Sequence, residues 1–181
     1  MTYFTMLIGP SGSGKSSYAE VLKNMIQNSI IISSDEIRAE LWGDAADQQN
    51  GAKVFQIMNE RTFNALKNGQ SVIYDATNLW ANTRTEMVKN IKALGIGCRC
   101  IAVVIRTPID QCKERQFLRD RKVPNEVIER QFNNFQEPTY REGWDNIMYH
   151  WSKKEAAFIV ASFFLLFCPF FYRAEQIIIY V

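Results

Sequence analysis

The sequence has little proline and glycine, with 5 Pro and 9 Gly in 181 residues, and its charges nearly cancel. Disordered and collagen-like chains need a very different proline, glycine and charge content, so these classes are excluded. The net charge of +2 is too small to indicate a nucleic-acid or membrane partner, although it is compatible with a local basic patch. With 47% hydrophobic residues, the chain is long enough and apolar enough to bury the core of one globular domain.

Cysteine and histidine are also scarce. The four cysteines show neither CxxC spacing nor a paired framework, which favours reduced intracellular thiols over disulfides or zinc ligands. The chain does not open with a basic segment, an apolar run and a small-residue cleavage site, so we expect a cytoplasmic protein. The one histidine, His150, has no partner near it in the sequence, and we expect it to be structural.

Short strand-like runs alternate with helix-like stretches up to about residue 150. We expect strands at Tyr3–Ile8, Ile30–Ile32, Val72–Asp75, Cys98–Ile105 and Trp144–Tyr149. We expect helices after Gly14, over Ala52–Lys67 and Asn82–Leu94, after a Thr107 cap with Pro108 at the first helical position, and after Pro124. This alternation predicts an α/β fold with a parallel sheet and helices on both faces.

The helix expected from Ala52 to Lys67 has a clear apolar periodicity. Phe55, Met58, Thr62 and Leu66 recur at helical spacing and share one face. Gly69 stands where a helix of this length ends.

The loop after the first strand carries the strongest chemical signal. Gly9-Pro10-Ser11-Gly12-Ser13-Gly14-Lys15-Ser16 fits the pattern GxxxxGK[ST] between a buried strand and an amphipathic helix. Small residues let backbone N–H groups converge on phosphate oxygens, while the lysine reaches the outer phosphates and a hydroxyl holds Mg²⁺. The candidate ATP-binding residues are Gly9, Ser11, Gly12, Ser13, Gly14, Lys15, Ser16 and Ser17. A dinucleotide-binding loop is the competing interpretation, but it gives Lys15 no role.

An acidic residue and a basic residue follow the second strand. Asp35 comes at the carboxyl end of that strand, and Arg38 shares its helical face if a helix begins there. A carboxylate at this edge accepts the proton of an attacking hydroxyl, and the arginine holds the acceptor's phosphate or steadies the carboxylate. A helix N-cap with a surface arginine is the alternative for the isolated pair. Beside a phosphate loop, the catalytic interpretation is favoured.

Asp75 ends the third strand in the same way. A carboxylate there positions Mg²⁺ through water, together with the Ser16 hydroxyl, or orients the acceptor. Capping of the following helix is a nearly equal alternative.

The helix after Pro108 is rich in basic residues. Lys113, Arg115, Arg119, Arg121 and Lys122 fall within ten residues, opposed in this segment by Glu114 and Asp120. Such a run is usually a solvated face. Phosphoryl transfer offers another role, because an arginine that reaches over the nucleotide from a helical lid neutralises the charge of the transferred group. Arg119 is slightly favoured over Arg115 for this role.

Four segments resemble the 5′-kinase domain of the polynucleotide kinase family. They are Gly9–Ser16, Ser34–Arg38, Asp75–Asn78 and the stretch from Cys98 to Ile147, which includes Phe132, Phe135, Glu137-Pro138-Thr139 and Glu142-Gly143-Trp144. The phosphate loop is shared by many kinases, whereas the D-x-x-R and D-x-T-N elements in this order are more specific. The resemblance covers nearly all of the chain before the C-terminal tail.

The resemblance implies a P-loop NTPase fold of the nucleotide kinase type with a helical lid. It implies that Lys15 and Ser16 bind ATP phosphates and Mg²⁺, that Asp35 is the general base on a 5′-hydroxyl, and that Arg38 contacts the acceptor's phosphate. A lid arginine, Arg119 or Arg115, would stabilise the transition state. The D-x-D-x-T motif of fused phosphatases does not occur, so 3′-phosphatase activity is not expected.

The tail departs from this composition. The 17 residues from Ala156 to Tyr172 carry no charge and include half of the 12 Phe. This length is at the short end of a membrane span, and Pro169 disturbs its last turn. We therefore expect a P-loop kinase domain at 1–152 and a hydrophobic Phe-rich tail at 153–181. Membrane anchoring through 156–172, packing on the domain or on a second copy, and a segment foreign to the kinase remain open, with anchoring not favoured.

Three functions fit these observations. The leading hypothesis is a Mg²⁺-dependent kinase that moves the ATP γ-phosphate to the 5′-hydroxyl of a DNA or RNA end. The second is a P-loop kinase of a small hydroxylated metabolite, such as a nucleoside or sugar. The third is a non-catalytic ATP-binding module, for which Asp35 and Arg38 have no evident use.

Overall fold

The computed structural model describes residues 1–43, 50–117 and 122–151. Its strands are β1 (Tyr3–Ile8), β2 (Ser29–Ser33), β3 (Ser71–Asp75), β4 (Arg99–Arg106) and β5 (Asn146–Trp151). Its helices are α1 (Lys15–Met25), α2 (Ser34–Trp42), α3 (Gly51–Lys67), α4 (Ala81–Ala93), α5 (Ile109–Phe117) and α6 (Asn125–Asn133), with the 3₁₀ turn η1 (Tyr140–Glu142) before β5. Every expected strand is confirmed to within two residues at each end.

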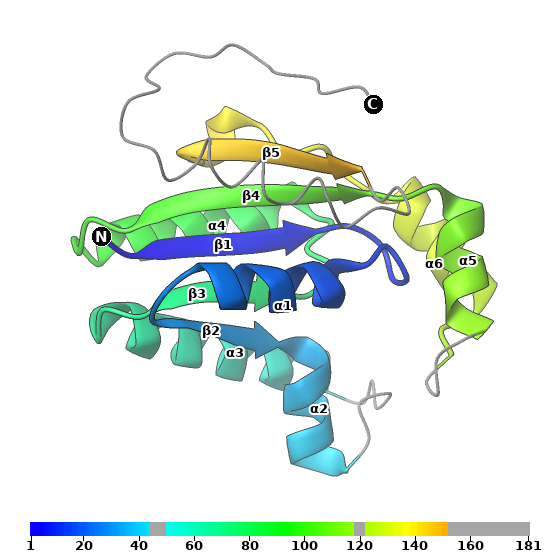
Figure 1. Ribbon diagram of the computed structural model, residues 1–181, viewed down its shortest axis with the longest axis horizontal. Coiled ribbons are helices and arrows are strands. Elements are labelled where there is room, and N and C mark those ends of the chain that lie inside the picture. The colour runs from blue at the N-terminus through cyan, green and yellow to red at the C-terminus, as the bar shows by residue number, and fades with distance from the viewer. Residues whose placement is uncertain (44–49, 118–121, 152–181) are drawn as a thin grey trace.

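The strands form one parallel sheet in the order β2-β3-β1-β4-β5. All arrowheads in Figure 1 point to the same edge, where α2 lies on one side and the α5–α6 pair on the other. The predicted α/β fold with a parallel sheet is therefore confirmed, and the residues that follow β1, β2 and β3 meet at this edge.

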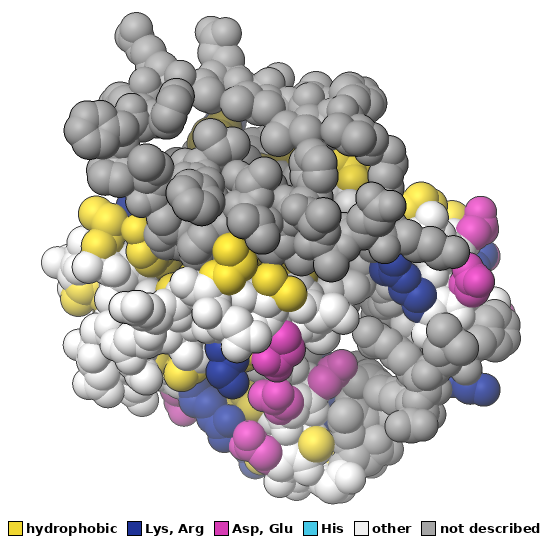
Figure 2. Space-filling model, viewed as in Figure 1, with side chains coloured by type: hydrophobic (Ala, Val, Ile, Leu, Met, Phe, Trp, Pro, Cys, Tyr) yellow, Lys and Arg dark blue, Asp and Glu magenta, His cyan; other side chains and the backbone are white. Residues whose placement is uncertain are grey.

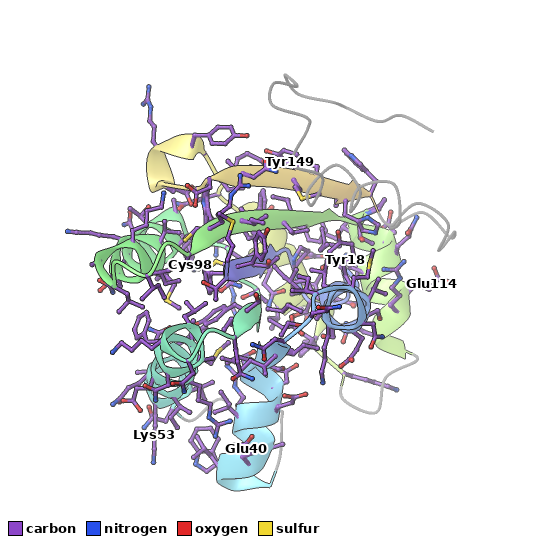
Figure 3. The ribbon with its side chains drawn as sticks, turned by 60° about the vertical axis from the view of Figure 1, so that its left-hand side comes forward. Tyr18, Glu40, Lys53, Cys98, Glu114 and Tyr149 are labelled. Carbon is purple, nitrogen blue, oxygen red and sulfur yellow. The ribbon has the colours of Figure 1, made fainter. Side chains whose placement is uncertain are left out.

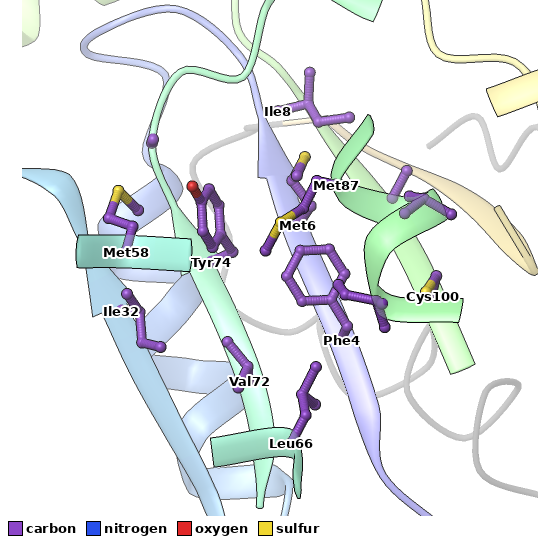
Figure 4. Packing of buried hydrophobic residues seen from close by; sticks show 14 of the residues in the cluster. Phe4, Met6, Ile8, Ile32, Met58, Leu66, Val72, Tyr74, Met87 and Cys100 are labelled. Atoms are coloured by element: carbon purple, nitrogen blue, oxygen red, sulfur yellow. The ribbon is translucent and has the colours of Figure 1, made fainter. Parts of the chain in front are cut away.

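Helices cover both faces of the sheet, and β1 supplies side chains to both cores. Phe4, Met6 and Ile8 pack with residues of α3 and α4, as Figure 4 shows, whereas Leu7 packs on the opposite face with α1. Alternate side chains of a strand point to opposite faces, so burial on both sides requires an apolar run. The loop that leaves β1 therefore starts from a strand that is buried on both faces.

Helix α3 is rotated relative to the expected orientation. Its buried residues are Val54, Met58, Thr62, Ala65 and Leu66. The expected face is thus right for Met58, Thr62 and Leu66 but wrong for Phe55, whose side chain remains 39% exposed. Val54 packs on the sheet in its place, and the next residue projects about 100° further around the helix.

The helix after β4 begins one residue later than expected. The Cys112 N–H donates to the Pro108 carbonyl at 3.0 Å, so Pro108 precedes α5 and is not its first residue. The Thr107 hydroxyl donates to the Ser13 carbonyl at 2.7 Å. The predicted cap is therefore wrong, because Thr107 lies two residues before α5. Its hydroxyl instead ties the end of β4 to the loop after β1.

A buried ion pair joins α4 to η1. The Arg84 Nε and Nη2 atoms each lie 2.8 Å from an oxygen of Glu142, and both side chains are buried. The Trp144 indole N–H donates to the same carboxylate at 3.0 Å. Burial alone raises the pKa of Glu142, but the hydrogen bonds from Arg84 and Trp144, with the charge of Arg84, outweigh burial and lower the pKa.

The ion pair also holds the turn that follows β3. The Arg84 Nη1 donates to the Asn78 carbonyl at 3.0 Å. Asn78 itself has a φ of 51°, and its side-chain amide donates to the Leu7 carbonyl at 2.7 Å. Because the Gly9 N–H donates to the Thr77 carbonyl at 3.0 Å, the turn after β3 and the loop after β1 are fixed to each other.

The division at residue 152 stays a prediction, since residues 152–181 lie outside the described residues. The candidate membrane segment at 156–172 falls in that range. Among residues 1–43, 50–117 and 122–151, no helix has the length and apolar character needed to cross a membrane.

We predict that Glu142→Gln lowers the free energy of unfolding by about 3–5 kcal/mol, because it leaves the Arg84 charge buried without a counter-charge. Denaturant titration at neutral pH measures this loss. Lys92→Gln is the control, since Lys92 pairs with Asp145 at 3.1 Å but remains 44% exposed. We expect that variant to lose less than about 1 kcal/mol.

The ion pair also predicts a pH dependence. The folded pKa of Glu142 lies below its ordinary value of 4.5, so its charge stabilises the fold fully above that value. This stabilisation is lost as the pH falls through the lower, folded pKa. The difference in unfolding free energy between wild type and Glu142→Gln should therefore shrink on acidification from about pH 6 to about pH 3. A constant difference over that range would argue against an ionised pair.

Candidate active site

A cavity of about 580 Å³ lies at the carboxyl edge of the sheet. Its lining comes from the loop after β1, the β2–α2 junction and the end of β3, with further residues from α3 and α6. The candidate residues Lys15, Ser16, Asp35, Arg38 and Asp75 all line it. Parallel pairing thus brings together side chains that are as far as 60 residues apart in the sequence.

The backbone of the phosphate loop depends on two glycines. Gly14 has a φ of 101° and precedes the first residue of α1, while Gly12 has a φ of 81°. A Cβ at residue 12 would lie 2.4 Å from the Cys112 carbonyl oxygen of α5. Only glycine fits there, because α5 packs directly against the loop.

Two polar contacts hold the outer part of the loop. The buried Lys15 ammonium donates to the Pro10 carbonyl at 2.8 Å and so lies across the loop. The Ser11 N–H donates to the Gln131 side-chain oxygen of α6 at 2.7 Å. Gln131 therefore accepts a hydrogen bond from a backbone N–H of the phosphate loop. No sequence motif indicated this contact.

Arg115 reaches the loop from α5. Its Nη1 donates to the Ser13 carbonyl at 3.2 Å and lies 3.4 Å from the Gly12 carbonyl. Arg119, the slightly favoured candidate, lies outside the described residues, as does Arg121. Either candidate for a transition-state arginine stays a prediction, although Arg115 is already in contact with the loop.

Part of the basic segment has a structural partner. The Lys113 ammonium lies 2.6 Å from a carboxylate oxygen of Glu129 on α6. This partner stands outside the ten-residue basic segment, on a neighbouring helix. This pair joins the two helices that flank the phosphate loop.

Asp35 is not the cap of α2. The Ser33 hydroxyl is the N-cap and accepts from the N–H groups of Asp35 and Glu36 at 3.3 and 3.5 Å. The Asp35 carboxylate is instead 52% exposed and lies 3.2 Å from the Nη1 of Arg38, whose side chain is only 9% exposed. The alternative of a capping acid with a surface arginine is therefore wrong. A buried guanidinium stands beside an accessible carboxylate.

Asp75 and Ser16 are suited to Mg²⁺. Asp75 is buried at the end of β3, and Ser16 stands in the first turn of α1, with both lining the cavity. Helix α4 begins at Ala81 after Trp80, so the alternative that Asp75 caps this helix is wrong. A carboxylate and a hydroxyl supply the hard oxygen donors that Mg²⁺ prefers, and this ion keeps several water or phosphate ligands of its own.

Sequence reasoning missed three residues around the site. Arg84 has the pattern of an exposed arginine on an amphipathic helix, and Gln131 belongs to no motif. The periodicity of α3 predicts that Phe55 faces the core, but Phe55 lines the cavity. His150, by contrast, packs against Tyr18 with ring centroids 4.7 Å apart, and burial lowers its pKa, in agreement with the expected structural role.

The family model described as an AAA domain, AAA_33, matches residues 4–138. The chain belongs to this family. The chain is also 26% identical over 146 residues to the L-seryl-tRNA(Sec) kinase of Methanococcus maripaludis. That match covers 77% of this chain and 55% of the relative, so the chain spans about half the length of the curated relative it matches.

Solved structures share the fold of this AAA_33 family member at low sequence identity. A fungal RNA kinase superposes with a TM-score of 0.67 and 16% identity, covering 93% of this chain and 86% of the kinase. A gluconokinase from Sinorhizobium meliloti superposes with a TM-score of 0.58 and 18% identity, covering 87% of this chain and 86% of the gluconokinase. The fold predicted for a P-loop kinase is confirmed by the family match and by these structures. Kinase activity and the finer assignment to polynucleotide kinases stay predictions.

We predict that Gly12→Ala destabilises the protein by about 3 kcal/mol and weakens ATP binding, because backbone strain adds to the collision with α5. Denaturant unfolding and titration calorimetry with ATP measure the two effects. Gly69→Ala is the matched control: its φ is 75°, but a Cβ there meets no atom within 4 Å. It should cost about 1 kcal/mol and leave ATP binding intact. Equal losses in both variants would contradict the close packing of α5.

Proposed function

We propose that this protein transfers the γ-phosphate of ATP to the 5′-hydroxyl of a DNA or RNA end. The observation that carries the proposal is the pairing of an accessible Asp35 with a buried Arg38 in the same cavity as Lys15 and Ser16. A nucleotide-binding module needs the loop alone. An acid and a guanidinium on the far side of the cavity have a use when a second substrate is present.

The loop side of the cavity receives ATP. The N–H groups of the loop and the first turn of α1 bind the phosphates, with the helix dipole adding to their attraction. Lys15 exchanges the Pro10 carbonyl for an outer phosphate oxygen. Mg²⁺, held by Ser16 and through water by Asp75, would neutralise phosphate charge there.

The α2 side of the cavity receives the acceptor. Asp35 takes the proton of the acceptor hydroxyl while the hydroxyl oxygen forms a bond to the γ-phosphorus. The bond between this phosphorus and the β,γ-bridging oxygen breaks, and ADP is released. Arg38 holds the acceptor's phosphate or steadies the Asp35 carboxylate. Arg115 or Arg119 would neutralise charge on the transferred group.

The acceptor is the finer part of the proposal. Two of the matched proteins are named for acceptors that are or contain RNA, a seryl-tRNA and RNA itself, which supports a nucleic-acid acceptor. The gluconokinase keeps a small polyol acceptor as the alternative. Figure 2 shows acidic and basic side chains side by side near α2, so recognition of a nucleic acid would depend on contacts at its end and not on a broad basic field.

We predict that Asp35→Asn lowers phosphoryl transfer at least 100-fold, because the amide cannot accept the hydroxyl proton. ATP affinity, measured by calorimetry, should be unchanged. Glu36→Gln is the control, since this neighbouring carboxylate is exposed and does not line the cavity. We expect it to keep wild-type turnover. Unimpaired transfer by Asp35→Asn would remove the proposed base.

An acceptor panel tests the substrate class. The protein is incubated with labelled ATP, Mg²⁺ and 5′-hydroxyl DNA, 5′-hydroxyl RNA, a nucleoside, gluconate or seryl-tRNA. We expect label on at least one oligonucleotide and little on the nucleoside or gluconate, because Arg38 can contact the phosphate that follows the reacting sugar. Transfer to a nucleoside or gluconate without transfer to an oligonucleotide would contradict the polynucleotide proposal.

A further inference from the structure

Phe55 is an exposed aromatic residue in a largely polar cavity. Its side chain is 39% exposed, while Lys15, Asp35 and Arg38 line the same space. The helical periodicity of α3 predicts that residue 55 faces the core, yet Val54 occupies the core position. What distinguishes this ring from an ordinary exposed side chain is its place in the lining of the same space as Lys15 and Asp35, where it is accessible to a ligand.

The direction of α3 puts this ring at the reacting edge of the sheet. Helix α3 ends shortly before β3 begins, so it runs antiparallel to that strand, and its first turns stand at the carboxyl edge. Val54 and Met58, one turn apart and both buried, set the rotation of the helix. Phe55 therefore projects from the side of α3 that lines the cavity.

Cross-links hold α3 in place on both sides. The Tyr74 hydroxyl of β3 donates to the Asn59 side-chain oxygen at 3.0 Å. Arg61 donates to both carboxylate oxygens of Glu40, at 3.0 and 2.5 Å, and thereby joins α3 to α2, where Figure 3 labels Glu40. Since α2 also carries Asp35, the ring and the carboxylate belong to two helices that contact each other.

We propose that Phe55 is a stacking surface for the terminal nucleobase of the acceptor. This inference rests on the proposed transfer to a nucleic acid 5′-hydroxyl. A planar base gains from stacking on an aromatic ring, and every base has such a face, so the contact tolerates any sequence. An open-chain polyol such as gluconate has no flat face, and Phe55 thus favours a nucleoside end over such an acceptor.

The stacking role is distinct from the roles of Asp35 and Arg38. Asp35 acts on the hydroxyl proton and Arg38 on charge, whereas Phe55 recognises the group attached to the sugar. Its loss should therefore raise the KM for a base-bearing acceptor and leave kcat nearly unchanged. An effect on the KM for ATP would place the ring against the adenine instead and overturn the proposal.

Two oligonucleotides test the inference with the whole 181-residue chain. They share one sequence and a 5′-hydroxyl, but the first nucleotide of one is abasic. We expect wild type to prefer the base-bearing oligonucleotide about tenfold in kcat/KM. Phe55→Ala should lose this preference through a higher KM on the base-bearing acceptor, with the abasic acceptor unaffected.

Further variants separate stacking from structure. Phe55→Trp should retain the preference and Phe55→Leu, apolar but not planar, should lose most of it. Tyr140→Ala, which removes an exposed ring of η1 outside the cavity, should keep wild-type values. Equal loss on both oligonucleotides in Phe55→Ala would indicate a merely structural ring and overturn the inference.

Failure of the inference can be told from failure of the proposed function. Equal kcat/KM of wild type on the two oligonucleotides overturns stacking and leaves 5′-hydroxyl transfer standing. If the wild type transfers phosphate from ATP to neither oligonucleotide, both the stacking inference and the proposed function are overturned.

Discussion

Parallel pairing of β1 with β3 on one side and β4 on the other is the constraint on which the site depends. It brings the carboxyl ends of strands from distant parts of the sequence to one edge, where their following residues share one space. The phosphate loop leaves β1 at this edge, and Asp75 ends β3 beside it. The chemistry of the cavity is thus a consequence of strand direction before any side chain is considered.

The phosphate loop is held by its neighbours as much as by its own glycines. Gly9 is tied to the turn after β3, Ser13 to the end of β4, and Ser11 to α6. The turn after β3 is in turn held by Arg84 of the buried Arg84–Glu142 pair. Residues up to about 130 positions from the loop therefore decide its position.

The sequence was sufficient for the sheet, the phosphate loop and the polar residues at the strand ends, because apolar runs and glycine spacing are local signals. It was insufficient where a tertiary contact overrides a local preference. Thr107 has the pattern of a cap but bonds the loop, and Phe55 has the period of a core residue but lines the cavity. Arg84 is a buried ion-pair partner on a helix whose pattern leaves it free to be exposed. Such contacts depend on which elements meet in space, and no periodicity records that.

The contacts of Lys15 and Gln131 have a further consequence for ligand entry. Both satisfy polar groups of the loop within the protein, at 2.8 and 2.7 Å. A phosphate that takes up the Lys15 ammonium and the Ser11 N–H displaces these two partners, so its binding exchanges one set of hydrogen bonds for another. The net free energy gained is therefore smaller than the sum of the new hydrogen bonds, and the charge of the phosphate supplies much of it.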